Sequence, residues 1–118
     1  MQQEALQSHF KRGVATLCIL SLLSEREMYG YEIAQALETI SGGGVILPEG
    51  TLYPILYRLE DDGYLDAKRI RVGKRMTRVY YRISENGQEY YAALLEDYNS
   101  IHTGVQLILS RSNEENEK

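Results

Sequence analysis

The segment PEGTLYPILYRLEDDGYL, residues 48–65, specifies the fold most clearly because it joins a helical pattern to a strand. Its apolar residues at positions 52, 55, 56 and 59 follow the i, i+3, i+4, i+7 spacing, which predicts a helix over about 50–62 with these side chains in the core. Proline lacks an amide hydrogen and is tolerated in the first helical turn, so Pro54 indicates a cap near Gly50 or Thr51. Gly63 is then expected to end the helix in a left-handed conformation.

The opposite side of this helix carries residues suited to contact a nucleic acid, namely Thr51, Tyr53, Pro54, Tyr57 and Arg58. The Thr51 hydroxyl and the helix N-terminus offer donors and a positive dipole end to a phosphate. Arg58 has the donor geometry to bind a guanine edge, and either tyrosine could pack on a thymine methyl or bind a phosphate. A plainer interpretation stays open, in which Tyr53 and Tyr57 cover the edge of the core.

Beyond Gly63 the apolar period changes to two, which predicts a β-hairpin with an apolar inner face and a basic outer face and tip. The inner face is expected to hold Ile70 and Val72 from the first strand and Val79, Tyr81 and Ile83 from the second. The chain has a net charge of −4, yet seven of its 13 Lys and Arg residues fall between Lys68 and Arg82, with no acid among them. Such a local basic patch attracts polyanions. Lys74, Arg75 and Arg78, at and just past the hairpin tip, are expected to neutralise DNA phosphates.

The remaining predicted helices and strands complete the order of elements along the chain. Helices are expected over about 4–24 and 30–41, with Ile33, Ala34, Leu37 and Ile40 on the apolar face of the second, and a brief strand at 45–48. Three helices followed by a hairpin give a mainly helical α+β fold, a winged helix-turn-helix in which the third helix enters the major groove of DNA. We therefore expect a winged-helix domain over 1–83, a C-terminal dimerisation helix over 84–110, capped by Ser84, and a flexible tail over 111–118.

The last helix carries a heptad-like apolar seam that a small domain does not need for its own core. This pattern predicts a homodimer on a pseudo-palindromic DNA site, with an interface formed by Leu6, Phe10, Tyr91, Leu94, Tyr98, Ile101, Val105 and Ile108. Tyr98 and His102 interrupt the aliphatic seam, which leaves room for a small hydrophobic or aromatic effector in a pocket formed by Phe10, Val14, Leu95, Tyr98 and His102. Simple interface packing by Tyr98 and His102 is the competing interpretation.

Several function classes are disfavoured by composition and motif content. The two histidines have no nearby nucleophile or acid arrangement, and there is no metal-ligand spacing or phosphate-binding glycine loop, so we expect no catalytic residue, metal or cofactor. The single cysteine, Cys18, lies in an apolar run and is expected to be a small buried side chain. No apolar stretch is long enough to span a bilayer, and no signal segment is evident, so we expect a cytoplasmic protein. A winged-helix module that binds an acidic protein instead of DNA remains the alternative.

Three segments together, YGYEIAQAL (29–37), residues 48–65 and RVYYRISENGQEY (78–90), resemble the PadR family of winged-helix transcription regulators, in particular its smaller subfamily with a single helix after the wing. The resemblance covers about residues 12–98. It implies a dimeric repressor, often of a nearby transporter or detoxification gene, and release from DNA by a small aromatic compound in some members. Drug-sensing relatives carry tryptophan where this chain has Tyr98, and the chain contains no tryptophan.

Overall fold

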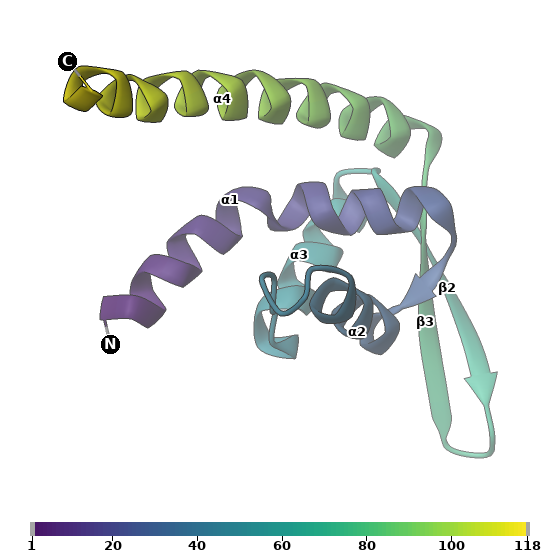
Figure 1. Cartoon of the computed structure of the whole chain (residues 1–118). Helices are drawn as coiled ribbons and strands as arrows, with labels where there is room; N and C mark the ends of the chain where they lie inside the picture. Colours follow the sequence, from purple (N-terminus) through teal and green to yellow (C-terminus); the bar gives the residue numbers. More distant parts are fainter. Residues whose placement is uncertain (1, 118) are drawn as a thin grey trace.

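The computed structural model describes the backbone of residues 2–117 and the side chains of residues 14–111. In chain order the elements are α1 (Gln2–Glu25), β1 (Met28–Tyr29), α2 (Gly30–Ile40), α3 (Glu49–Asp61), β2 (Leu65–Val72), β3 (Met76–Ile83) and α4 (Glu85–Glu117). Figure 1 shows α1 in a middle layer, with α4 on one side and α2 and α3 on the other, while the β2–β3 hairpin extends away from α4. The mainly helical winged-helix fold predicted from the sequence is therefore confirmed.

The sheet has three antiparallel strands in the order β1-β3-β2. Strand β1 was not predicted; it pairs Met28 with Tyr81 and Tyr29 with Tyr80, and so ties the start of α2 to the wing. The brief strand expected at residues 45–48 is wrong, because this segment has no strand partner and instead places Leu47 in the core. The hairpin is therefore anchored at its base by β1, and its tip extends freely.

The register of the hairpin corrects one prediction about its faces. Leu65 is opposite Ile83 and Ala67 is opposite Tyr81, and three of these four side chains are buried. Side chains alternate along a strand, so counting from Leu65 puts odd-numbered β2 residues on the inner face. Ile70 and Val72 consequently lie on the outer face, where Ile70 is opposite Arg78, and Arg69 and Arg71 share the inner side with Tyr81.

One apolar core holds α1, α2, α3 and the base of the sheet together. The second half of α1 contacts α4, α2 and β3 and buries one face, with Ala15, Ile19, Leu20, Leu22 and Leu23 in the core. The full burial that its all-round apolar sequence predicts is not reached, because Leu17 and Cys18 are only half-buried. The largest fully buried side chains in this core are Ile19, Leu20, Leu23, Ile33, Leu52, Leu56, Leu65 and Tyr81. Ile40 departs from the expected apolar face of α2, because it lies at the last turn and is 72 % exposed.

The junction between α3 and α4 fixes the direction of the long C-terminal helix. Gly63 has φ +83°, and the amides of Gly63 and Tyr64 donate to the carbonyls of Glu60 and Leu59, which is the predicted left-handed helix end. The Ser84 hydroxyl donates to the Gly63 carbonyl (2.6 Å) and accepts from the Gly87 amide (3.0 Å), so Ser84 caps α4 as expected.

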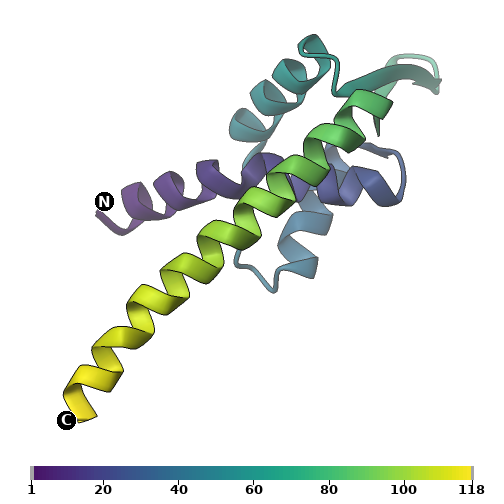
Figure 2. The same cartoon turned by 90° about the horizontal axis from the view of Figure 1, so that it is seen from above.

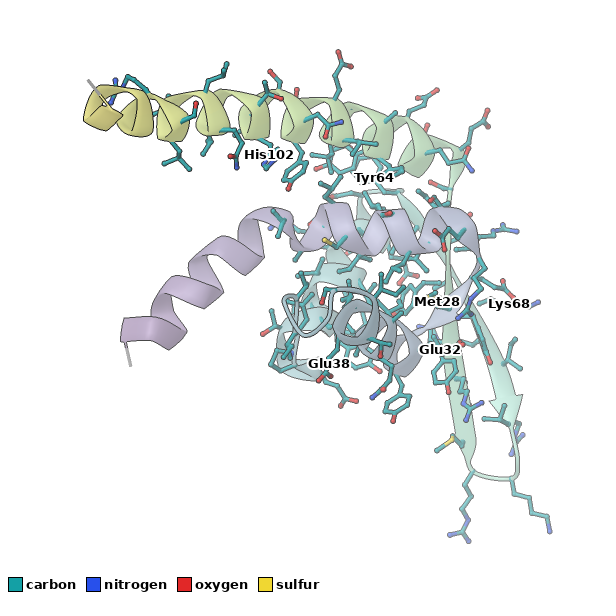
Figure 3. All side chains as sticks on the ribbon, in the orientation of Figure 1. Met28, Glu32, Glu38, Tyr64, Lys68 and His102 are labelled. Atoms are coloured by element: carbon teal, nitrogen blue, oxygen red, sulfur yellow. The ribbon has the colours of Figure 1, made fainter. Side chains whose placement is uncertain are left out.

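Two further contacts press the first turns of α4 against this junction. The rings of Tyr64 and Tyr90 stack with centroids 4.1 Å apart, and Figure 3 shows Tyr64 beneath the start of α4. Gly87 faces the Tyr64 carbonyl so closely that a Cβ would overlap its oxygen. From here α4 crosses α1 and projects beyond the domain (Figure 2). It continues to Glu117, past the expected end at Ser110, because no Gly or Pro follows Gly104 to stop it.

Candidate nucleic-acid interface

Helix α3 presents most of the expected contact residues to solvent. Its N-cap is Pro48, whose carbonyl accepts from the amides of Thr51 and Leu52 at 2.9 Å, so the cap lies two residues before the one expected near Gly50. Pro54 consequently lies in the second turn. It has no amide hydrogen to donate to the carbonyl four residues earlier, and because Pro54 is exposed, water can donate to that carbonyl instead. Arg58 is also exposed, Tyr57 is 55 % exposed, and Thr51 is half-buried.

Tyr53 does not face outward as predicted. It is half-buried and packs against the core, with its ring against Gly30 at the start of α2. Burial raises the pKa of its hydroxyl, and Glu49 and Tyr57 add to the increase. The ring centroids of Tyr53 and Tyr57 are 6.0 Å apart, so the half-buried Tyr53 and the exposed Tyr57 form one tilted pair.

Replacing Gly30 by alanine should displace Tyr53. A Cβ at position 30 would lie 2.5–2.8 Å from three atoms of the Tyr53 phenol group, so the ring must move. We expect a loss of about 1–2 kcal/mol in the free energy of unfolding, measured by urea denaturation, and weaker DNA binding. Gly50→Ala is the matched control, since a Cβ there meets no described atom within 4 Å. Equal stability of both variants would contradict the Gly30–Tyr53 contact.

A hollow of about 430 Å³ brings α2, α3 and the wing together. It is lined by Tyr29, Gly30, Tyr31, Tyr53, Met76, Thr77, Arg78 and Val79. Its lining includes three phenol groups, one hydroxyl and one guanidinium, and none of the lining residues is acidic. On a chain with 17 acidic residues, this composition favours an anionic partner.

The basic residues of the wing fall into two groups in the structure. Lys74 and Arg75 lie exposed at the tip, where both project into solvent as predicted. Lys68 and Arg69 are also exposed, whereas Arg71 and Arg82 have partners within the chain. Arg71 Nη2 donates to the Lys74 carbonyl (2.9 Å), and Arg82 Nη2 pairs with Asp66 Oδ2 (3.4 Å). Arg78 is half-buried, with its guanidinium carbon 4.5 Å from the centroid of the Tyr29 ring.

Three residues of this surface were missed from the sequence. Tyr29 and Tyr31 flank Gly30 and line the hollow, but they belong to a helix start to which no sequence pattern assigns a functional role. Arg69 is exposed on the inner side of the wing, close enough to Tyr81 to lower its pKa, which burial raises to about 12 overall. Alternation counted from Leu65 would have placed Arg69 on this side.

The apolar seam of α4 divides into two parts. Tyr91 and Leu94 are half-buried and pack against the core of their own chain. Tyr98 is partly exposed where α4 still passes α1 and α2. Ile101, Val105 and Ile108 are exposed on the projecting part of the helix, together with Leu107 and Leu109. The expected interface residues Leu6 and Phe10 lie outside the described side chains.

The expected effector pocket is only partly reproduced within one chain. A mainly apolar hollow of about 270 Å³ lies between α1, the end of α2 and α4, and its lining includes Cys18, Tyr91, Leu95 and Tyr98. Burial raises the pKa of the half-buried Cys18 thiol. Val14 and His102 are not in this lining; His102 instead stacks on Tyr98 with ring centroids 5.7 Å apart, on the side of α4 that faces α1 (Figure 3). Phe10 lies outside the described side chains.

Comparison with known proteins establishes the family. Residues 19–93 match the model of the transcriptional regulator PadR-like family. The chain belongs to the PadR-like family of transcriptional regulators. It is 38% identical over 100 residues to the transcriptional regulator Rv3488 of Mycobacterium tuberculosis, covering 85% of this chain and 87% of that protein. The family and this relative are regulators, in agreement with the non-enzymatic function expected from the sequence.

Solved structures of PadR regulators share the fold. A PadR family regulator from Eggerthella lenta superposes with a TM-score of 0.78 at 27% identity, covering 90% of each chain. A transcriptional regulator from Clostridium thermocellum gives a TM-score of 0.75 at 34% identity, covering 80% of this chain and 92% of that one. Within the described residues, no helix is long and apolar enough to cross a membrane, and no cluster of side chains is placed to hold a metal ion.

Proposed function

We propose that this PadR-like regulator is a homodimeric, cytoplasmic repressor that binds a pseudo-palindromic duplex through α3 and the wing. The observation that carries the proposal is the shared hollow, since it joins Tyr53 of α3 to Thr77 and Arg78 of the wing. A recognition helix and a wing that meet around a hollow with no acidic lining residue can contact neighbouring parts of the same DNA backbone.

The contacts within this surface divide by chemistry. Arg58 and Tyr57 are exposed on α3. Their proposed role is to contact base edges in the major groove, where a guanidinium binds guanine bidentately. Thr51 lies in the first turn of α3, where its hydroxyl can donate to a phosphate. Pro54 is exposed on the same helix and adds only a compact ring to this surface. Lys74 and Arg75 at the tip supply charge to phosphates and make binding salt-dependent.

Dimerisation is supported by the projecting half of α4. Ile101 is 66 % exposed and Ile108 is 60 % exposed, and large apolar side chains that line one exposed stripe usually mark an interface. The partner that fits is the same helix of a second copy, because a twofold axis makes such a stripe self-complementary. It would also set the spacing of the two recognition helices.

The regulated gene and the signal follow from the family resemblance. We propose repression of a nearby transporter or detoxification gene, relieved by a small aromatic compound. The hollow bordered by Leu95 and Tyr98 offers a mainly apolar site of suitable size for such a compound. An apolar ligand that binds there would contact both α4 and the core beneath it.

The proposal is tested by titrating the protein with the duplex directly upstream of its own gene, with excess unrelated DNA present. Lys74→Ala/Arg75→Ala should weaken binding by about 10- to 100-fold and reduce the slope of log affinity against log salt by about 1.8. Lys68→Ala/Arg82→Ala removes the same charge nearer the base of the wing and should change both quantities much less. No binding to any duplex at low salt would favour the protein-binding alternative.

A further inference from the structure

The side chain of Arg78 is held differently from those of Lys74 and Arg75 at the wing tip. Its guanidinium carbon lies 4.5 Å from the centroid of the Tyr29 ring, within the range of a cation–π contact. It also lines the hollow between α2, α3 and the wing, in which no lining residue is acidic. Within the described residues, Arg78 therefore has an aromatic partner and no paired carboxylate.

Tyr29 is itself fixed from three directions. Its backbone pairs with Tyr80 across β1 and β3, and the two rings meet edge to face with centroids 5.4 Å apart. Its amide donates to Glu32 Oε1 (3.2 Å), and Glu32 Oε2 in turn pairs with Arg26 Nη1 (3.2 Å). Figure 3 places Met28 and Glu32, on either side of Tyr29 in the chain, where the sheet meets α2. The ring is therefore a rigid support for the guanidinium.

A rigid support matters because a free arginine side chain loses rotamer entropy when it binds a phosphate. An aromatic face that already restricts the guanidinium reduces this loss, and it leaves the N–H groups at the ring edge available to an anion. The neighbouring Thr77 and Tyr31 hydroxyls border the same hollow and can add donors. The anion that a winged-helix surface meets is the phosphodiester of the DNA backbone.

We propose that Tyr29 is a positioning residue, whose ring holds the Arg78 guanidinium at this hollow to bind one phosphate of the DNA backbone. The inference rests on the proposed DNA-binding function and deepens it, since it assigns a role to the tyrosine that precedes α2. It also separates the wing cations into one oriented contact, Arg78, and two tip contacts, Lys74 and Arg75, that become ordered on binding.

The test is a double-mutant cycle read out as affinity for a short duplex over about 50–200 mM salt. Tyr29→Leu should weaken binding roughly three- to tenfold, while Tyr29→Phe, which keeps the ring, should stay within about twofold of the parent. Arg78→Ala should reduce the salt slope by about 0.9. In the Arg78→Ala background, Tyr29→Leu should have no further effect, because the ring acts only through the arginine.

Several results would overturn the proposal. A Tyr29→Leu loss that persists in the Arg78→Ala background would mean that Tyr29 acts on its own, and a Tyr29→Phe loss as large as that of Tyr29→Leu would assign the effect to the hydroxyl. Unchanged binding by Tyr29→Leu, with weakened binding by Lys74→Ala/Arg75→Ala, would remove this inference and keep the proposed function. A parent protein that binds no duplex would overturn both.

A measurement on the unaltered protein keeps the inference testable if Tyr29→Leu does not fold. In the parent, the Arg78 side-chain proton resonances should be shifted upfield by the ring current of Tyr29, with the assignment made from the Arg78→Lys spectrum. Arg78 resonances at their ordinary positions would show that the ring does not hold the guanidinium in solution.

Discussion

Replacing Ile101 and Ile108 with glutamate is expected to convert the proposed homodimer into a monomer. These side chains lie one heptad apart on the exposed stripe of α4, and a twofold interface would bury four new carboxylates in apolar surroundings. We expect the dimer to weaken by at least about 100-fold, or about 3 kcal/mol. Light scattering coupled to size exclusion should then report the 13.5 kDa chain mass instead of twice that value.

The matched control is Asn99→Glu/Gln106→Glu. It adds the same charge at the same seven-residue spacing, on exposed positions about 150° around α4 from the Ile101–Ile108 stripe. This control should remain dimeric and bind DNA like the parent, whereas the Ile101→Glu/Ile108→Glu variant should lose most of its operator affinity. A parent that is already monomeric at micromolar concentration would contradict the dimer interface on α4.

Replacing Gly87 with alanine is expected to destabilise the fold by about 3 kcal/mol. The added Cβ would overlap the Tyr64 carbonyl oxygen and press on Ile83 Cγ1, and a backbone oxygen at the end of α3 cannot move without disturbing that helix end. The start of α4 must therefore shift, which would also break the Ser84 cap and the Tyr64–Tyr90 stack. The midpoint of urea unfolding measures this loss directly.

Gly50→Ala serves as the control for Gly87→Ala, since it also adds a methyl group to a helical glycine. A Cβ at position 50 meets open space among the described residues, so stability should stay constant or rise by up to about 1 kcal/mol. If Gly87→Ala were as stable as Gly50→Ala, the close contact between α4 and the end of α3 would be incorrect.

The parts of the fold that depend on local chemistry could be predicted from the sequence. The burial of Leu52, Leu56 and Leu59 follows from helical periodicity, and the helix end at Gly63 follows from its freedom to adopt positive φ. Ser84 was predicted as a cap because its hydroxyl can serve the first free amides of a helix. Each of these features depends only on residues that are close together in the sequence.

The corrected features depend on contacts between segments that are distant in sequence. Strand β1 has two residues and therefore no period, so only its pairing with β3 reveals it. Tyr53 turns inward because Gly30, on another helix, leaves space for its ring. Ile70 and Val72 lie in the part of the hairpin beyond the core, where burial no longer selects which face is apolar.

The candidate site shows the same division. The exposure of Arg58 was predicted because helical periodicity places it opposite the apolar stripe of α3. The exposure of Lys74 and Arg75 was predicted because both lie in the turn of the hairpin. The orientation of Arg78 was not, since it depends on a ring contributed by the residue before α2. Charge patterning identified the basic segment but could not tell which side chains already have partners within the chain.

The central claim is that two chains, paired through α4, read one duplex with two equivalent α3 helices. Selection of bound sequences from a random duplex pool, long enough for two half-sites, tests it most directly, because the selection itself reveals the operator sequence. We expect enrichment of an inverted repeat with half-sites about 10 bp apart, centre to centre, or a multiple of this spacing. Enrichment of an unrepeated motif would contradict the dimeric arrangement, and a pool that remains random would contradict sequence-specific DNA binding.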